Sequence, residues 1–142
     1  MRSFFYTLKS GLLILGLFFA LPSCKNDKAI ICTQEYKMLT VTIKNSNGDP
    51  VYLWWYSVSK KSTGEGLDFS HEDPYQDSIN RTQGIYTIFT DGLMDMTTRE
   101  GMEFDFLMMN GSMPVVIGTY LIGKDDCHCL LLAGNTEIVL NN

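Results

Sequence analysis

The chain has two histidines, and the first of them, His71, lies among carboxylates. Glu72 and Asp73 follow it directly, and Asp77 comes shortly after. A histidine beside a carboxylate can transfer protons in catalysis, and clustered carboxylates can bind calcium. The segment lacks the glycine and glutamate of a calcium-binding loop, and the chain has no Gly-x-Ser-x-Gly or His-Glu-x-x-His motif. A solvated loop is therefore the favoured interpretation, and a small hydrolase that uses His71 is the alternative.

The second histidine lies in Cys127-His128-Cys129, whose residue types bind zinc. Alternate side chains of a β-strand share a face, so in a strand the two thiols point one way and His128 points the other. The three groups then cannot meet at one ion. The methionines that cluster late in the chain are more often used to fill a core than to bind a soft metal. We expect no metal, no cofactor and no catalytic residue.

The densest aromatic segment after residue 23 is 51–58, Val-Tyr-Leu-Trp-Trp-Tyr-Ser-Val. In a strand this segment has two faces. The more apolar face, which we expect between the sheets, holds Val51, Leu53 and Trp55. The opposite face holds Tyr52, Trp54, Tyr56 and Val58. The three rings of that face would form an outer stripe that can stack on sugars or anchor a protein partner, unless neighbouring side chains or the segment 59–77 cover it.

The elements that position these residues are predicted to be short strands. From Met38 onward, apolar residues recur mainly with period two, and turn residues separate the runs. The predicted strands are 38–43, 51–58, 84–89, 101–109, 115–122, 127–133 and 136–140. Asn110-Gly111 and Gly134-Asn135 each predict a hairpin, and no segment shows a convincing helical stripe. This pattern predicts one all-β domain, a two-sheet antiparallel sandwich, with a partly open barrel as the alternative.

The first residues predict export. Arg2 and Lys9 flank a short aromatic stretch, and the apolar run 11–21 follows, which is shorter than the roughly 20 residues of a transmembrane helix. The run leads into Leu21-Pro22-Ser23-Cys24, which resembles the lipobox of bacterial lipoproteins. That resemblance implies thioether diacylation of Cys24, cleavage before it, and acylation of the new amino group, for example with palmitate. Two or more acyl chains hold a protein stably at a membrane.

The chain is thus expected to consist of a signal peptide (1–23), a polar tether (24–31) and a β-sandwich domain (32–142). The tether starts with Cys-Lys-Asn-Asp, a weak likeness to the signals that send some Bacteroidota-type lipoproteins to the cell surface. We expect attachment at the outer membrane and leave the leaflet open. After cleavage, the chain would contain 9 Lys and Arg residues and 16 Asp and Glu residues, which gives a net charge of −7. Nucleic acid is therefore not an expected partner.

Three cysteines remain when Cys24 is set aside, which fits one disulfide and one spare thiol in an oxidising compartment. Cys127 and Cys129 would share a strand face, so either one can reach Cys32. The preferred pair is Cys32 with Cys127, and Cys129 is the alternative partner.

A second resemblance rests on Cys32 before the first strand, on the turn Lys-Asn-Ser-Asn-Gly-Asp-Pro-Val at 44–51, and on 120–128 with the Leu-Ala-Gly that follows. These features resemble small Bacteroidota lipoproteins with a carboxypeptidase-regulatory-like, transthyretin-like β-sandwich. The resemblance implies such a sandwich, a bridge from Cys32 to the Cys127-His128 segment, and no known activity. Cys129 departs from the aliphatic residue usual there. We expect a lipid-anchored cell-envelope module without enzyme activity that binds a protein partner or glycan or supports an envelope assembly; a domain without any ligand is another alternative.

Replacing the expected lipid acceptor tests the first of these expectations. Cys24→Ala should abolish membrane attachment and leave the domain folded, because the anchor and the predicted core are separate parts of the chain. Incorporation of labelled fatty acid and membrane fractionation measure the effect. Labelling of the variant at the level of the unchanged chain would contradict the assignment of Cys24.

Overall fold

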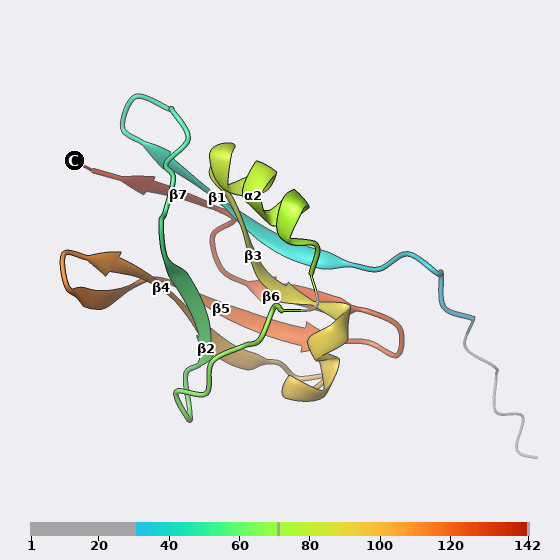
Figure 1. Ribbon diagram of the computed structural model, residues 1–142. Helices are drawn as coiled ribbons and strands as arrows, with labels where there is room; N and C mark the ends of the chain where they lie inside the picture. Colours follow the sequence, from blue (N-terminus) through green and yellow to red (C-terminus); the bar gives the residue numbers. More distant parts are fainter. Residues whose placement is uncertain (1–30, 71, 142) are drawn as a thin grey trace, which may run out of the picture. The chain divides into compact units, whose positions relative to one another are not determined.

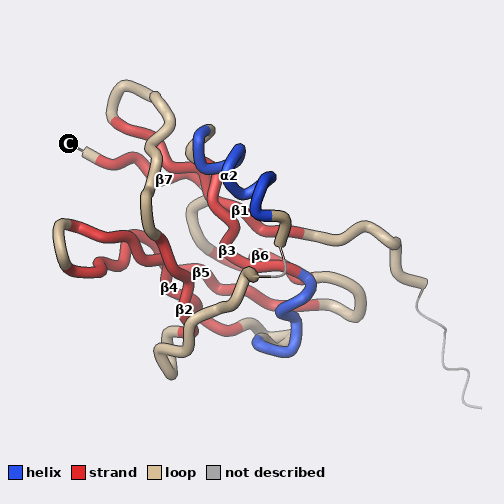
Figure 2. Tube along the Cα trace, viewed as in Figure 1, coloured by secondary structure: helices blue, strands red, loops and turns tan. Residues whose placement is uncertain are grey.

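Seven strands and two helical segments make up the regular structure of residues 31–70 and 72–141, which the computed structural model describes (Figures 1 and 2). The strands are β1 (Met38–Asn45), β2 (Tyr56–Lys60), β3 (Ile85–Thr90), β4 (Met102–Asn110), β5 (Met113–Lys124), β6 (Cys129–Ala133) and β7 (Glu137–Leu140). The helical segments are α2 (Pro74–Thr82) and the 3-10 helix η2 (Asp91–Met96). Cys24 and His71 lie outside the described residues.

The strands form two sheets, in the orders β3-β1-β7 and β2-β4-β5-β6. In the first sheet, the central strand β1 runs antiparallel to β3 and parallel to β7. In the second sheet all neighbours are antiparallel, and the predicted hairpin at Asn110-Gly111 is confirmed as the connection of β4 to β5. Burial alternates along β1, where Leu39, Val41 and Ile43 are buried. Each sheet therefore presents one apolar face to the other.

The core lies between the two sheets and is rich in aromatic rings. Phe89 of β3 and Phe104 of β4 have ring centroids 5.1 Å apart, so they pack across the interface between the sheets. The side chains with no exposed surface are Val41, Ile43, Val58, Tyr86, Ile88, Phe89, Phe104, Phe106, Ile122 and Cys129. The predicted all-β, two-sheet sandwich is confirmed.

The predicted hairpin of 127–133 with 136–140 is wrong. β6 pairs with β5, whereas β7 crosses to the other sheet and pairs with β1, with Ile43 opposite Ile138. The crossing begins where the Thr42 N–H donates to the Thr136 carbonyl at 2.8 Å. Without β7, β1 would be an edge strand, paired with β3 on one side only. Pairing there also packs Ile138 and Leu140 against the core.

The strand predicted for 51–58 starts five residues later than expected, at Tyr56. Tyr86 explains the difference, because its hydroxyl accepts from the Leu53 N–H and donates to the Val51 carbonyl, both at 2.7 Å. These bonds satisfy backbone groups that would otherwise need a neighbouring strand. Residues 51–55 are therefore held in an irregular path.

This irregular path changes which side chains face the core. Val58 is fully buried, and Tyr56, two residues before it, turns inward with it and packs against the core. Leu53 is buried as predicted, whereas Trp55 and Val51 are only half-buried. The outward assignment of Tyr56 and Val58 is thus wrong, because the alternation begins at Tyr56 rather than at Val51.

Helix α2 was not predicted, although its ends carry recognisable signals. The Asp73 carboxylate accepts from the Tyr75 N–H at 2.9 Å and caps the helix, and Pro74 occupies its first turn. Asp77 and Arg81 form an ion pair one turn apart. The helix has no buried residue, so it lacks the apolar stripe on which the prediction of helices depends.

Two glycines with positive φ provide a matched test of this packing. At Gly84 (φ 69°) an added Cβ would lie 2.5 Å from the Ile43 carbonyl oxygen, whereas at Gly48 (φ 88°) nothing lies within 4 Å. Gly48→Ala should cost about 1 kcal/mol of unfolding free energy, for its backbone conformation alone. Gly84→Ala should cost about 3 kcal/mol or more, because the β1 backbone must also move. Urea unfolding of both variants measures the difference, and equal losses would contradict this account.

Candidate functional site

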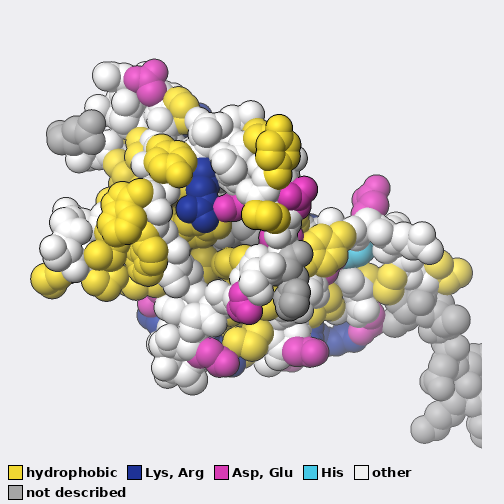
Figure 3. Space-filling model, viewed as in Figure 1, with side chains coloured by type: hydrophobic (Ala, Val, Ile, Leu, Met, Phe, Trp, Pro, Cys, Tyr) yellow, Lys and Arg dark blue, Asp and Glu magenta, His cyan; other side chains and the backbone are white. Residues whose placement is uncertain are grey.

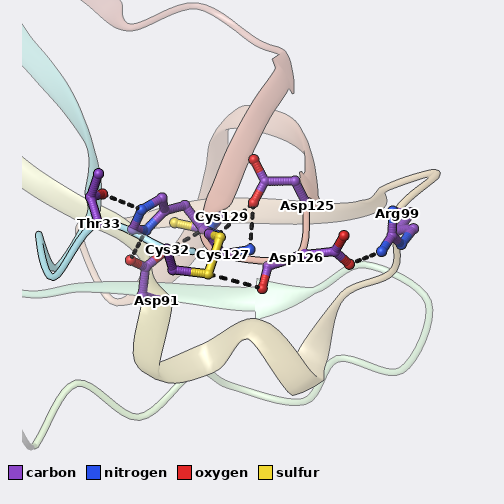
Figure 4. Close-up of a disulfide and its surroundings, with 9 residues drawn as sticks. Cys32, Thr33, Asp91, Arg99, Asp125, Asp126, Cys127 and Cys129 are labelled. Atoms are coloured by element: carbon purple, nitrogen blue, oxygen red, sulfur yellow. Dashed lines mark hydrogen bonds and ion pairs between the residues drawn. A yellow bond between two sulfur atoms is a disulfide. The ribbon is translucent and has the colours of Figure 1, made fainter. Parts of the chain in front are cut away.

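The first region with chemical groups in close contact surrounds a disulfide (Figure 4). Cys32 and Cys127 are joined by an S–S bond of 2.05 Å across a sequence separation of 95, which confirms the preferred pair. Cys129 is a free, buried thiol, so the prediction of one bridge and one spare thiol is also confirmed. A link over a loop of this length typically contributes about 2 to 4 kcal/mol.

The segment before β6 is a turn rather than a strand. Asp125 Oδ1 accepts from the N–H groups of Cys127 and His128, both at 2.7 Å. The alternation expected for 127–129 therefore does not apply, because β6 begins only at Cys129.

Asp91, the first residue of η2 and directly after β3, connects this turn to the start of β1. Its carboxylate accepts from the Lys37 N–H, the Cys129 N–H and His128 Nδ1, each at 2.8 Å. Burial acts to raise the pKa of Asp91, but these hydrogen bonds outweigh burial and lower the pKa to about 2. The carboxylate is therefore ionised at neutral pH. No sequence signal linked Asp91 to His128, which is 37 residues away.

The hydrogen bonds continue from Asp91 through His128 to Thr33, whose Oγ1 lies 3.0 Å from His128 Nε2. Carboxylate, imidazole and hydroxyl follow one another in the order found in catalytic triads. Here each partner has a structural reason to be present, because Thr33 and His128 directly follow the two bridged cysteines. We interpret this series of hydrogen bonds as a structural contact that fixes the segment before β1 against the start of β6.

The free thiol of Cys129 has low reactivity in this environment. Burial, with the nearby Asp91 carboxylate, raises the pKa of the thiol to about 12. Because the thiolate is the form that attacks a disulfide, Cys129 does not readily exchange with the neighbouring bridge.

The second region is a cleft beside α2, with a volume of about 420 Å³. Figure 3 shows it as a hollow with hydrophobic side chains inside and charged side chains at its margin. Its walls come from β1, β2, β3, the segment 67–70 and the start and inner side of α2. The lining residues are Met38, Tyr56, Ser57, Val58, Leu67, Phe69, Ser70, Glu72, Asp73, Pro74, Gln76, Asp77, Asn80, Arg81 and Thr87.

Tyr56 joins α2 to the sandwich at this cleft. One face of its ring stacks on Phe106, with centroids 5.5 Å apart, and the Arg81 guanidinium lies 4.8 Å from the ring centroid. Burial, followed by the charge of Asp77, raises the pKa of Tyr56 to about 12. The hydroxyl stays protonated and donates to Asp77 Oδ1 at 3.3 Å, while Arg81 Nε donates to Asp77 Oδ2 at 2.7 Å.

The predicted aromatic stripe is therefore divided. Tyr52 and Trp54 are 61% and 68% exposed, so neighbouring side chains do not cover these two rings, which lie on the segment that leads into β2. Tyr56 instead packs inward and lines the cleft. The cleft itself was not predicted, because it depends on α2; the Asp73-Pro74 cap was the signal that could have indicated it.

The carboxylates considered for calcium have separate roles. Glu72 Oε1 accepts from the Tyr36 hydroxyl at 3.0 Å, Asp73 caps α2 and Asp77 pairs with Arg81. Among residues 31–70 and 72–141, no group of three or more His, Cys, Asp or Glu side chains is arranged to hold a metal ion. His71, the histidine of the hydrolase alternative, lies outside these residues.

Comparison with known protein families, curated proteins and solved structures finds no significant match to this chain. Within the described part of the chain, no helix is long and apolar enough to cross a membrane.

The central role of Asp91 can be tested by removing its charge. Because the folded-state pKa of about 2 lies below the ordinary value of 3.8, the ionised carboxylate stabilises the fold above about pH 4, and this contribution is lost as the pH falls through 2. Asp91→Asn should cost about 2 kcal/mol at pH 7 and progressively less between pH 4 and pH 2. Urea unfolding across this range measures it, with Asp95→Asn, at an exposed position of η2, as the control. A loss that does not vary with pH would refute the electrostatic explanation.

Proposed function

We propose that the chain is a lipid-anchored cell-envelope module that binds a protein partner or a glycan at the cleft beside α2. The observation that carries this proposal is the cleft itself. Its volume of about 420 Å³ is in the range of ligand sites, and apolar lining residues lie next to a few polar side chains.

The exposed rings of Tyr52 and Trp54 support a binding role. They are among the most exposed large hydrophobic side chains of the described residues, and they precede Tyr56, which lines the cleft. Figure 3 shows hydrophobic side chains gathered next to the hollow. Exposed Trp and Tyr side chains are favoured at contacts because one part of the ring is apolar and another is polar.

The attachment to a membrane rests on the sequence. Leu21-Pro22-Ser23-Cys24 resembles a lipobox, and the disulfide of the folded domain is typical of an exported protein. The two-sheet sandwich agrees with the resemblance to transthyretin-like lipoproteins. Lipid on Cys24 would attach the domain, and with it the cleft, to a membrane.

A binding role accounts for the cleft better than catalysis does. Asp77 and Arg81 neutralise each other there, and Tyr56 keeps its proton. The triad-like set of Thr33, His128 and Asp91 is not part of the cleft lining. Among the described residues, this set therefore lies away from the cleft, whereas hydrolysis there would need a nucleophile and a base next to the substrate.

Truncation of the exposed ring tests this proposal. Trp54→Ala should weaken binding at least about tenfold while the melting temperature stays within about 2 °C, because the ring is 68% exposed and contributes little to the core. The full chain in nonionic detergent is assayed on a glycan array. In cells, a photo-crosslinking residue at Gln76 reports a protein bound at the cleft.

Val139→Ala is the matched control, since Val139 is 52% exposed and lies on β7 of the other sheet. It should leave array binding and crosslinking unchanged. The proposal fails if Trp54→Ala and Val139→Ala behave alike in both assays, or if Gln76 gives no more crosslinked product than a position on β5 such as Val116.

A further inference from the structure

We propose that the occupant of the cleft is a Lys or Arg side chain of a protein partner. Its apolar stem would lie on the floor of the cleft, formed by Val58, Leu67 and Phe69, and its cationic head would lie at the acidic rim, formed by Glu72 and Asp73. This inference rests on the proposed function, since it names the chemistry that the same cleft recognises.

The floor of the cleft suits an aliphatic stem. Val58 is fully buried beneath it, and Leu67 and Phe69 are half-buried and pack against the core. Long basic side chains place their methylene groups along such apolar surface and keep the charged head toward water. A volume of about 420 Å³ accommodates one such side chain together with part of its backbone.

The charges of the cleft favour a cation. Arg81 is the one cationic residue among the described side chains that line the cleft, and Asp77 neutralises it at 2.7 Å. Glu72 and Asp73 then remain, and the hydrogen bonds that they accept from described residues come from neutral groups, the Tyr36 hydroxyl and the Tyr75 N–H. The N-terminus of α2 adds about half a positive charge, which leaves the rim negative by more than one charge.

Stacking of a sugar on Tyr56 is disfavoured by the same geometry. Phe106 and the Arg81 guanidinium both lie against the Tyr56 ring, at 5.5 Å and 4.8 Å between the relevant centres. A sugar would need one free aromatic face. Tyr56 therefore serves to hold α2 in place and does not act as a platform for a ligand.

The test uses two small probes with stems of the same length. Nα-acetyl-lysinamide carries the ammonium group, and Nα-acetyl-norleucinamide has the same stem without it. NMR of the full chain in nonionic detergent follows the side-chain amides of Gln76 and Asn80, which line the cleft. We expect the lysine probe to shift these signals with at least about tenfold higher affinity than the norleucine probe, and added salt to reduce the difference.

Two variants remove the rim charge while keeping its hydrogen bonds. Gln at position 72 can still accept from Tyr36, and Asn at position 73 caps a helix about as well as Asp. Glu72→Gln with Asp73→Asn should lower the affinity for the lysine probe about tenfold and leave the norleucine probe unchanged. Asp95→Asn with Glu100→Gln, at exposed positions outside the cleft, changes the net charge equally and should affect neither probe.

The outcomes separate this inference from the function on which it rests. Equal affinity for the two probes, or equal effects of the two double variants, would overturn the cation assignment. If maltose shifts the Gln76 and Asn80 signals and the lysine probe does not, the cleft binds a glycan and only the present inference fails. If no probe shifts these signals and Trp54→Ala is without effect on binding, both fail.

Discussion

One carboxylate, that of Asp91, holds together three stretches of chain that are far apart in the sequence. It receives hydrogen bonds from the residue before β1, from the imidazole of His128 and from the first residue of β6. These bonds lie next to the Cys32–Cys127 bridge, and the same charge helps to keep the Cys129 thiol protonated. The disulfide therefore closes an arrangement that the carboxylate organises, and the third cysteine is prevented from competing for it.

The cleft has a different physical origin, in the irregular path from Val51 to Tyr56. Tyr86 binds the backbone of this path with its hydroxyl and so prevents it from joining β2. The delayed start of β2 turns Tyr56 inward, where Phe106 and Arg81 enclose it. Helix α2 has no buried residue, and Asp77 and Arg81 connect it to Tyr56 of the sandwich by a hydrogen bond and a cation–π contact. A helix attached in this way leaves space beneath it, and that space is the cleft.

The sequence predicted the features that depend on local periodicity. The alternation in Met38–Asn45 and the turn at Asn110-Gly111 were enough for β1, the β4–β5 hairpin and the two-sheet class, and the cysteine count was enough for one bridge and one spare thiol. The features it did not predict depend on contacts between distant residues. The hydrogen bonds of the Tyr86 hydroxyl delay the start of β2 to Tyr56, which reverses the side chains that face the core. β7 pairs with β1 instead of with β6. The partners of Asp91 could not be predicted either. His128 is 37 residues away from Asp91 and Lys37 is 54 residues away, and hydrogen bonds over such separations leave no local sequence pattern.

The parallel pairing of β1 with β7 also bears on how the domain is made. The first strand is the centre of its sheet, yet one of its two neighbours is the last strand, so Ile43 meets its partner Ile138 only after nearly the whole domain has been synthesised. Contacts between such distant residues form slowly, because the intervening chain must first be brought together. A chain threaded through a membrane from its N-terminus would thus emerge with β1 lacking one neighbour and stay incomplete until residues 137–140 had followed. If the chain is exported, as proposed, this topology delays folding until passage is nearly finished, which is compatible with transport in an unfolded state.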